Sequence, residues 1–366
     1  MKFSKDDTLC MKGIAILILF FHHNYLGPDR WLNSPISFYP FSQSQIMYIA
    51  KFLKICVGMF VFLTGYGMLA SVKTKSLDDK AMRKYTVNRY LTMMMGFWLI
   101  FLLVHILSGI FTDRFTDRFT EVYGTGTYSV IYFLIDGIGL AKLFDTPTFC
   151  ATWWYMSLAT MLILLFPMFK KLLERYQGIL LILTIFLPKA FNLPYADLWR
   201  WLFCYTLGMY MAEHDLLAKI KEKFTSFGML KRCLIFGILT IGIPVIIMLR
   251  QSEGFGIKFL YLWEGIAPAY VIVYAYLFVV WIKPLAAVLH FLGKHSMNMF
   301  LTHTMFRAVY FHDFMYSFYS MWLDYIALII VSVLVSVAIE IVKKLIRFQK
   351  ITTFVKDRAC QILKLT

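Results

Sequence analysis

Long runs of apolar residues alternate with short polar segments along the whole chain. A helix needs about 20 mostly apolar residues to cross the hydrocarbon core of a bilayer, which is about 30 Å thick. Ten runs are that long or nearly so, and they lie at residues 10–27, 46–71, 89–111, 150–169, 178–190, 196–213, 231–250, 259–282, 287–311 and 321–345. The pattern therefore predicts an all-α membrane protein with about ten transmembrane helices. We expect a single domain over residues 1–350 and a C-terminal tail over 351–366.

An eleventh apolar stretch, residues 128–143, is a poorer candidate for a span. It contains Asp136, Lys142 and two glycines, and charged side chains are costly inside a bilayer. We therefore expect this stretch to re-enter the membrane or to lie in the interface rather than to cross.

The distribution of lysine and arginine predicts an orientation, because cytoplasmic loops carry an excess of both. If the N-terminus is cytoplasmic and residues 128–143 do not cross, the cytoplasmic segments are those richest in basic residues: 73–89, 170–175, 219–223, 283 and 343–350. We expect a multi-pass protein of the cell membrane with both termini in the cytoplasm and the lipid bilayer around it. Topology then explains the excess of 37 basic over 21 acidic residues, so no nucleic acid partner is expected.

Composition excludes a soluble enzyme. The chain is 60% hydrophobic and 16% charged, with a mean hydropathy of +0.67, which is far from the values of a soluble globular domain. Its six cysteines are scattered, without metal-ligand or redox spacing, and no glycine-rich phosphate loop, nucleophile elbow or zinc helix motif occurs. We expect no metal site.

The first apolar segment contains a cation and two titratable rings, Lys12, His22 and His23. On a helix, eleven steps amount to about three turns, so Lys12 and His23 share one face about 16 Å apart. Such groups are costly in a bilayer and often mark a functional site. A lysine anchored at the membrane edge and a core histidine with a polar partner explain them equally well.

The second predicted span contains Phe60, Thr64 and the glycines Gly58, Gly65 and Gly67. Small residues let a helix or a ligand approach the backbone closely. Taken alone, this composition is typical of ordinary helix packing in membranes.

Five short motifs occur in order along the chain. They are Lys12 with a ten-residue gap before His23, Phe60-Val-Phe-Leu-Thr-Gly65, Arg89 preceded by Arg83 and Lys84, Trp153-Trp154-Tyr155 running on to Pro167, and Leu292-Gly-Lys-His-Ser-Met-Asn-Met-Phe-Leu-Thr-His303. Together they resemble the acyltransferase-3 family of integral membrane acyltransferases, over residues 10 to about 345.

The resemblance implies transfer of an acyl group, usually acetyl, from acetyl-coenzyme A to a hydroxyl of a cell-envelope carbohydrate or its lipid-linked precursor. It assigns His23 as the general base, a role that suits an imidazole with a pKa near 6.5. His22 stands beside it as the alternative base. Lys12, Arg89 and Lys84 would hold the phosphates of the donor.

The sequence departs from the family pattern at two of these motifs. Lys12 stands where the family more often has arginine, so a point charge replaces a bidentate guanidinium. Thr64 replaces the usual serine and keeps its hydroxyl. The remaining residues predicted to line a substrate cavity are Phe60, Thr64, Trp154, Glu264, Ser296 and His303.

Two other functions are also compatible with the sequence. One is a transporter or flippase for a polar or acylated solute, although no matched pair of broken helices is visible. The other is an acyl carrier that serves a separate transferase. Acceptor specificity is expected in loops such as 27–45 and 112–150, and the sequence says nothing of the oligomeric state or the acyl chain length.

Overall fold

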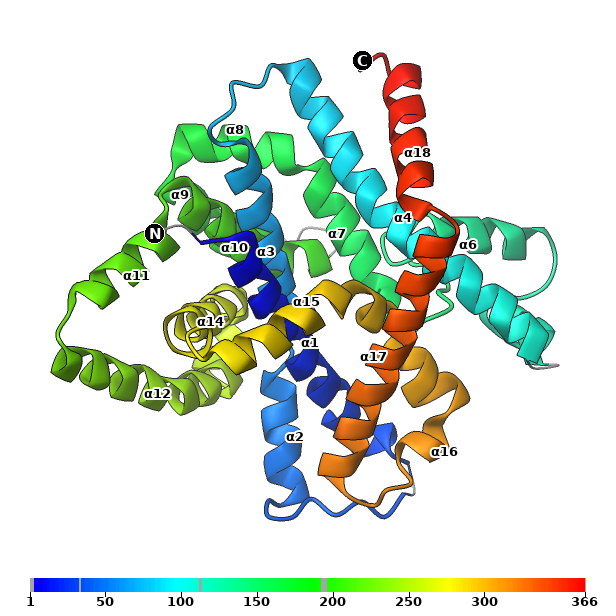
Figure 1. Cartoon of the computed structure of the whole chain (residues 1–366), viewed down its shortest axis with the longest axis horizontal. Coiled ribbons are helices and arrows are strands. Elements are labelled where there is room, and N and C mark those ends of the chain that lie inside the picture. Colours follow the sequence, from blue (N-terminus) through cyan, green and yellow to red (C-terminus); the bar gives the residue numbers. More distant parts are fainter. Residues whose placement is uncertain (1–2, 33, 112–113, 192–195, 366) are drawn as a thin grey trace. The chain divides into compact units, whose positions relative to one another are not determined.

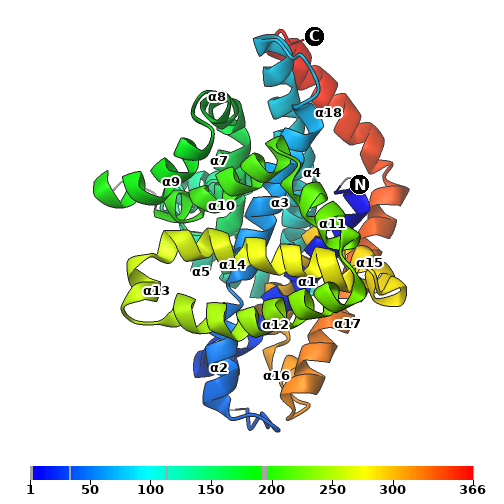
Figure 2. The same cartoon turned by 90° about the vertical axis from the view of Figure 1, so that its left-hand side faces the viewer.

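The computed structural model describes residues 3–32, 34–111, 114–191 and 196–365. Over these residues every regular element is helical and no strand is formed; a single isolated bridge joins Ser37 and Ser320. Figures 1 and 2 show the helices from two directions. The predicted all-α class is confirmed.

Five helical stretches of the described chain are both long and apolar enough to cross a membrane. They are Gln43–Val72, Asp79–Ser108, Met229–Gln251, Leu260–Val279 and Met321–Leu345, and a sixth is counted if the bent pair Ala151–Leu164 and Phe166–Tyr176 forms one broken span. The bend in this pair falls just before Pro167, and proline is tolerated in the first turn of a new helix but not inside a continuous one. The protein is therefore a multi-pass membrane protein.

The predicted number of about ten spans is not confirmed. Three helices, α1 (Lys5–Tyr25), α10 (Ala196–Glu213) and α15 (Lys283–Thr304), are long enough, but they carry polar or charged side chains that lower their mean hydropathy. Helix α9 (Gly178–Phe191) is short. Helix α6 (Thr127–Gly137) has eleven residues, about 17 Å, and is too short to cross.

The chain packs as two compact units, each assembled from segments that are distant in sequence. Unit 1 comprises Met1–Ser76, Phe169–Ser296 and His312–Ile330, and unit 2 comprises Leu77–Met168, Met297–Phe311 and Val331–Thr366.

Unit 1 is built around α3 (Ile55–Val72), which is apolar on all sides and therefore suited to a central position. Helices α1, α10 and α14 (Leu260–Tyr274) pack against it. Helix α2 (Gln43–Phe52) precedes α3 and contacts α1. None of the apolar side chains of the peripheral helix α12 (Met229–Gln251) is buried, and most of them are exposed, as expected for a helix that faces lipid.

Glycines set the close helix contacts of unit 1. A Cβ atom on Gly13 of α1 would lie 2.0 Å from the carbonyl oxygen of Leu289 in α15, and one on Gly293 of α15 would lie 1.9 Å from that of Leu9. Similarly, a Cβ atom on Gly65 of α3 would lie 2.3 Å from the carbonyl oxygen of Tyr205 in α10. Only glycine permits backbones to approach this closely.

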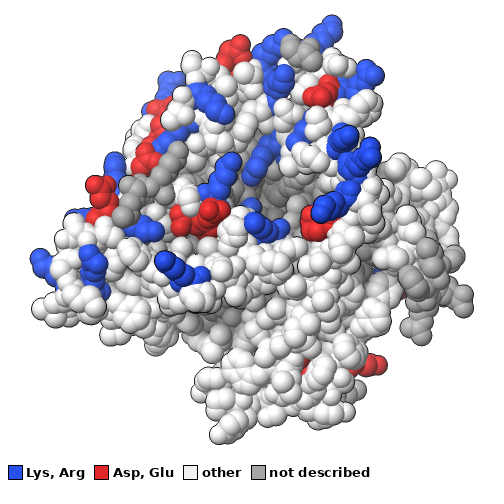
Figure 3. Space-filling model, in the orientation of Figure 1, with Lys and Arg blue, Asp and Glu red and all other residues white. Residues whose placement is uncertain are grey.

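Charge is unevenly distributed on unit 1. Lys and Arg side chains gather over α11 (Leu216–Ser226), whereas the surface over α2 and α16 (His312–Met315) shows almost none on the drawn face (Figure 3).

Unit 2 is organised along α4 (Asp79–Phe111), whose 33 residues extend for about 50 Å. Helices α5 (Arg114–Tyr123), α7 (Trp154–Leu164) and α18 (Phe348–Ile362) pack against it. An aromatic cluster that includes Phe97, Phe101, Phe149 and Trp153 fills its core. Most of the predicted C-terminal tail is thus helix α18, which lies against α4.

Candidate functional site

Helix α1 runs without a break from Lys5 to Tyr25, so the spacing of Lys12 and His23 is that of a regular helix. The helix begins at Lys5 because Ser4 and Asp7 form a capping box, in which the Asp7 N–H donates to Ser4 Oγ at 3.0 Å and the Ser4 N–H donates to Asp7 Oδ2 at 2.8 Å. Lys12 and His23 are both partly buried. The three-turn spacing therefore places them on one face, about 16 Å apart along the axis.

The two adjacent histidines have different surroundings. His22 is buried, with Nδ1 2.7 Å from the carbonyl oxygen of Ala50 in α2. A carbonyl oxygen only accepts, so Nδ1 of His22 carries the proton and donates it. The ring of His23 lies 5.2 Å from that of His22, tilted by 46°. His22 thus ties α1 to α2, while His23 is the more accessible ring of the two.

Phe60 and Thr64 lie one turn apart on α3, which packs against α1. The Thr64 hydroxyl donates to the carbonyl oxygen of Phe60 at 2.8 Å. Its proton is therefore engaged within the helix, and the hydroxyl oxygen can act toward a ligand as an acceptor.

Glu264 on α14 is fully buried and paired with two arginines. Arg200 of α10 donates through Nε at 2.9 Å, and Arg250 of α12 donates to both carboxylate oxygens at 3.0 and 3.1 Å. A buried carboxylate needs such partners. The sequence predicts that a buried Glu264 needs a partner, but it does not identify Arg200 and Arg250, because they are 64 and 14 residues away.

Ser296 and His303, both in the last sequence motif, have local hydrogen bonds. The Ser296 hydroxyl donates to the carbonyl oxygen of Gly293 at 2.8 Å in unit 1. In unit 2, His303 is fully buried, with Nδ1 2.7 Å from the carbonyl oxygen of Phe300 and Nε2 3.2 Å from Thr304 Oγ1. Both nitrogens of His303 therefore have partners within α15.

The motif also contains Asn298, which is not among the predicted site residues. Its amide donates to Glu340 Oε1 at 2.8 Å and accepts from Lys343 Nζ at 3.0 Å in unit 2. Its place in this motif and its polarity within an apolar run are the signals in the sequence that point to it.

Trp154 is partly buried at the start of α7, beside Trp153, whose indole N–H donates to the carbonyl oxygen of Leu301 at 3.0 Å.

Lys84 and Arg89 are exposed on the first turns of α4. Five helical steps separate them by about 140°, so they lie on different faces of that helix.

The predicted residues thus fall into two groups. Unit 1 holds Lys12, His22, His23, Phe60, Thr64, Glu264 and Ser296, whereas unit 2 holds Lys84, Arg89, Trp154 and His303. Within unit 1, the structure brings the α1 and α3 motifs together on packed helices.

A comparison with protein families finds one matching family model, described as an acyltransferase domain, over residues 10–341. No curated protein and no solved structure matches the chain.

Proposed function

Because the chain belongs to the acyltransferase-3 family and is therefore an acyltransferase of the membrane, we propose that it transfers an acetyl group from acetyl-coenzyme A to a hydroxyl of a cell-envelope carbohydrate, free or lipid-linked. The observation that carries this proposal is the unbroken helix α1, on which a cation and an accessible imidazole share one face. A donor with phosphates and an acceptor hydroxyl need these two groups.

We propose ten spans in the cell membrane, with residues 128–143 in the interface and both termini in the cytoplasm. Lysines lie over α11, whereas the drawn surface over α2 and α16 is nearly free of Lys and Arg, and this difference supports the orientation (Figure 3). Lys12 then lies toward the cytoplasm, where coenzyme A thioesters are available, and His23 lies toward the envelope.

In the proposed reaction His23 removes the proton of the acceptor hydroxyl. The resulting oxygen attacks the thioester carbonyl, an ester C–O bond forms, and the C–S bond breaks. The coenzyme A thiolate leaves and takes up a proton. Within unit 1, Lys12 contributes positive charge to the donor phosphates, and Phe60, Thr64, Glu264 and Ser296 belong to the walls or supports of the substrate site.

His23→Ala tests the proposal, with His22→Ala as its neighbour control. With radiolabelled acetyl-coenzyme A and membranes that contain the endogenous glycan, we expect His23→Ala to lower transfer by at least about 100-fold, the lower end of what a general base contributes. His22→Ala should retain transfer and lose stability, since it removes the bond to Ala50. Full activity of His23→Ala would contradict the role of His23, and loss only in His22→Ala would assign the base to His22.

A further inference from the structure

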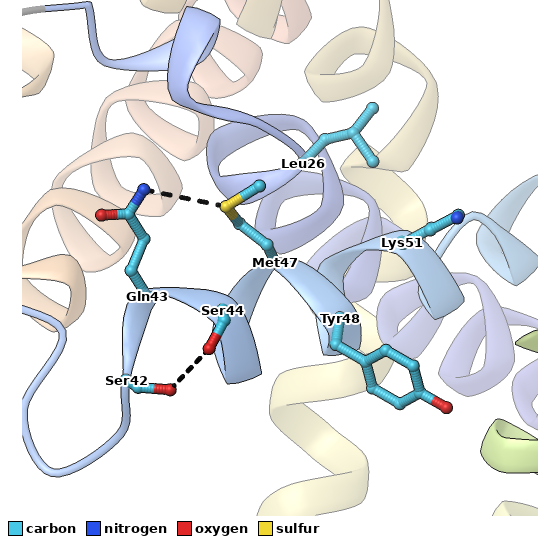
Figure 4. Close-up of a pocket in the computed structure, with 7 residues that line it drawn as sticks. All are labelled: Leu26, Ser42, Gln43, Ser44, Met47, Tyr48 and Lys51. Carbon is cyan, nitrogen blue, oxygen red and sulfur yellow. Dashed lines mark hydrogen bonds between the residues drawn. The ribbon is translucent and has the colours of Figure 1, made fainter.

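Unit 1 has an open pocket where α1 ends and α2 begins. Its volume is about 610 Å³, and it is lined by Leu26, Ser42, Gln43, Ser44, Met47, Tyr48 and Lys51 (Figure 4). This volume is within the range of small-ligand sites, about 300–1,000 Å³. We call it the α1–α2 pocket.

The α1–α2 pocket begins one helical turn beyond the two histidines. Leu26 continues α1 in helical conformation, so it lies three residues and about 4.5 Å along the axis from His23, and on the same side as His22 at i+4. The bond between His22 and Ala50 holds α2 against α1, and α2 with its N-cap Ser42 carries the other six lining residues. The pocket, which Leu26 lines, therefore begins within one helical turn of the predicted base, His23.

The position of α2 is also locally determined. Ser42 and Gln45 form a capping box, in which the Ser42 N–H donates to Gln45 Oε1 at 2.9 Å and the Gln45 N–H donates to Ser42 Oγ at 3.3 Å. This cap starts the helix so that Ser44, Met47, Tyr48 and Lys51 recur at helical spacing along the pocket.

The lining combines apolar surface with neutral hydrogen-bonding groups. Leu26, Met47 and the ring of Tyr48 offer apolar faces, and Tyr48 is 44% exposed. A sugar ring presents C–H faces and a rim of hydroxyls, and it therefore needs both kinds of surface.

Two hydrogen bonds within the lining could be replaced by hydrogen bonds to a ligand. The Gln43 amide donates to the thioether of Met47 at 3.8 Å, and Ser42 and Ser44 share a hydrogen bond of 3.0 Å (Figure 4). A thioether is a weak acceptor, so a ligand hydroxyl would be a better partner for Gln43. Lys51 is the charged residue of the lining, which favours a neutral or anionic ligand over a cationic one.

We propose that the α1–α2 pocket binds the acceptor carbohydrate and presents one of its hydroxyls to His23. The inference rests on the proposed function and extends it by assigning the acceptor site. Within the predicted specificity loop, residues 27–45, it assigns acceptor binding to residues 42–44, and it adds Met47, Tyr48 and Lys51 of α2.

The test separates donor chemistry from acceptor binding. Ser44→Trp fills the pocket and Tyr48→Ala removes its aromatic wall. Tyr176→Ala, at the end of the helix Phe166–Tyr176, is the matched control because Tyr176 is exposed to a similar degree as Tyr48. Each variant is assayed in membranes with radiolabelled acetyl-coenzyme A at varied donor concentration, for acetyl ester in the endogenous glycan. We expect transfer to fall about tenfold in the two pocket variants, as for a lost binding contact of that size, while their KM for acetyl-coenzyme A and the Tyr176→Ala control stay within about twofold.

A second variant excludes misfolding as the cause. In a Cys233→Ser background, which removes the exposed native thiol, Ser44→Cys should transfer acetyl normally and lose transfer only after a bulky maleimide reacts with it. The same reaction at Ser317→Cys, an exposed position near α16, should have no effect.

The outcomes are distinct. Absence of transfer by the unmodified protein would overturn the proposed function. Normal transfer by Ser44→Trp and by labelled Ser44→Cys, with an active unmodified protein, would overturn the pocket assignment alone. Label in a lipid extract or in the aqueous polymer identifies a lipid-linked or a free glycan, and either result supports the assignment if it depends on Ser44.

Discussion

Lys12 carries an ammonium group on a flexible side chain, and it shares one face of α1 with the imidazole of His23. The sequence predicted this geometry correctly because a helix repeats its angle at every residue. It did not predict that the neighbouring histidine would donate to Ala50, since that partner comes from another helix.

We expect Lys12→Ala to raise the KM for acetyl-coenzyme A by about tenfold, because about 1.4 kcal/mol of attraction to the donor phosphates is lost. Lys12→Arg keeps the charge and should remain within about threefold of the unmodified protein. Steady-state kinetics at varied donor concentration measure both. An unchanged KM in Lys12→Ala would show that this lysine only anchors the helix.

Glu264 is the residue whose loss should cost most in stability. Glu264→Gln leaves Arg200 and Arg250 without their shared carboxylate, and breaking a buried pair costs about 3–5 kcal/mol. Thermal unfolding in detergent should therefore shift strongly downward. Glu174→Gln is the control, because Glu174 pairs with Lys170 on an exposed surface, where such pairs contribute at most about 1 kcal/mol; equal shifts in the two variants would contradict the buried-pair argument.

At the scale of the elements, the glycines of the motifs have a packing role. Gly13 follows Lys12 and Gly293 precedes Lys294, and both lie where α1 and α15 approach each other. The sequence showed that small residues allow close approach, but not which of them are used. That depends on how the helices meet in space.

Two glycines of α3, Gly65 and Gly67, allow this packing role to be tested with matched substitutions. A Cβ atom on Gly65 would collide with the backbone of α10, whereas one on Gly67 would meet nothing within 4 Å in the described part of the chain. We expect Gly65→Ala to lower the free energy of unfolding by about 1–3 kcal/mol and Gly67→Ala to be neutral or stabilising by up to about 1 kcal/mol. Unfolding by heat or denaturant in detergent measures both, and the reverse order would refute the contact.

At the scale of the whole molecule, the proposed orientation has a direct test. In a Cys233→Ser background, a membrane-impermeant maleimide should label Ser317→Cys in intact cells, because the proposed orientation puts residue 317 in an envelope-facing loop. Lys223→Cys, on the basic surface of α11, should be labelled only after the membrane is opened. Labelling of Lys223→Cys in intact cells would reverse the orientation.

The sequence by itself determined the membrane environment, the helical class, the regular geometry of α1 and the order of motifs that placed the chain in its family. These properties depend on composition and on periodicity over at most a few turns, which are local. Only the tertiary structure decided that Glu264 pairs with Arg200 and Arg250, that His22 donates to Ala50 of α2, and that Leu26 and α2 line a common pocket. Those outcomes depend on which helices meet, because a buried polar group takes its partner from whatever chain segment packs against it.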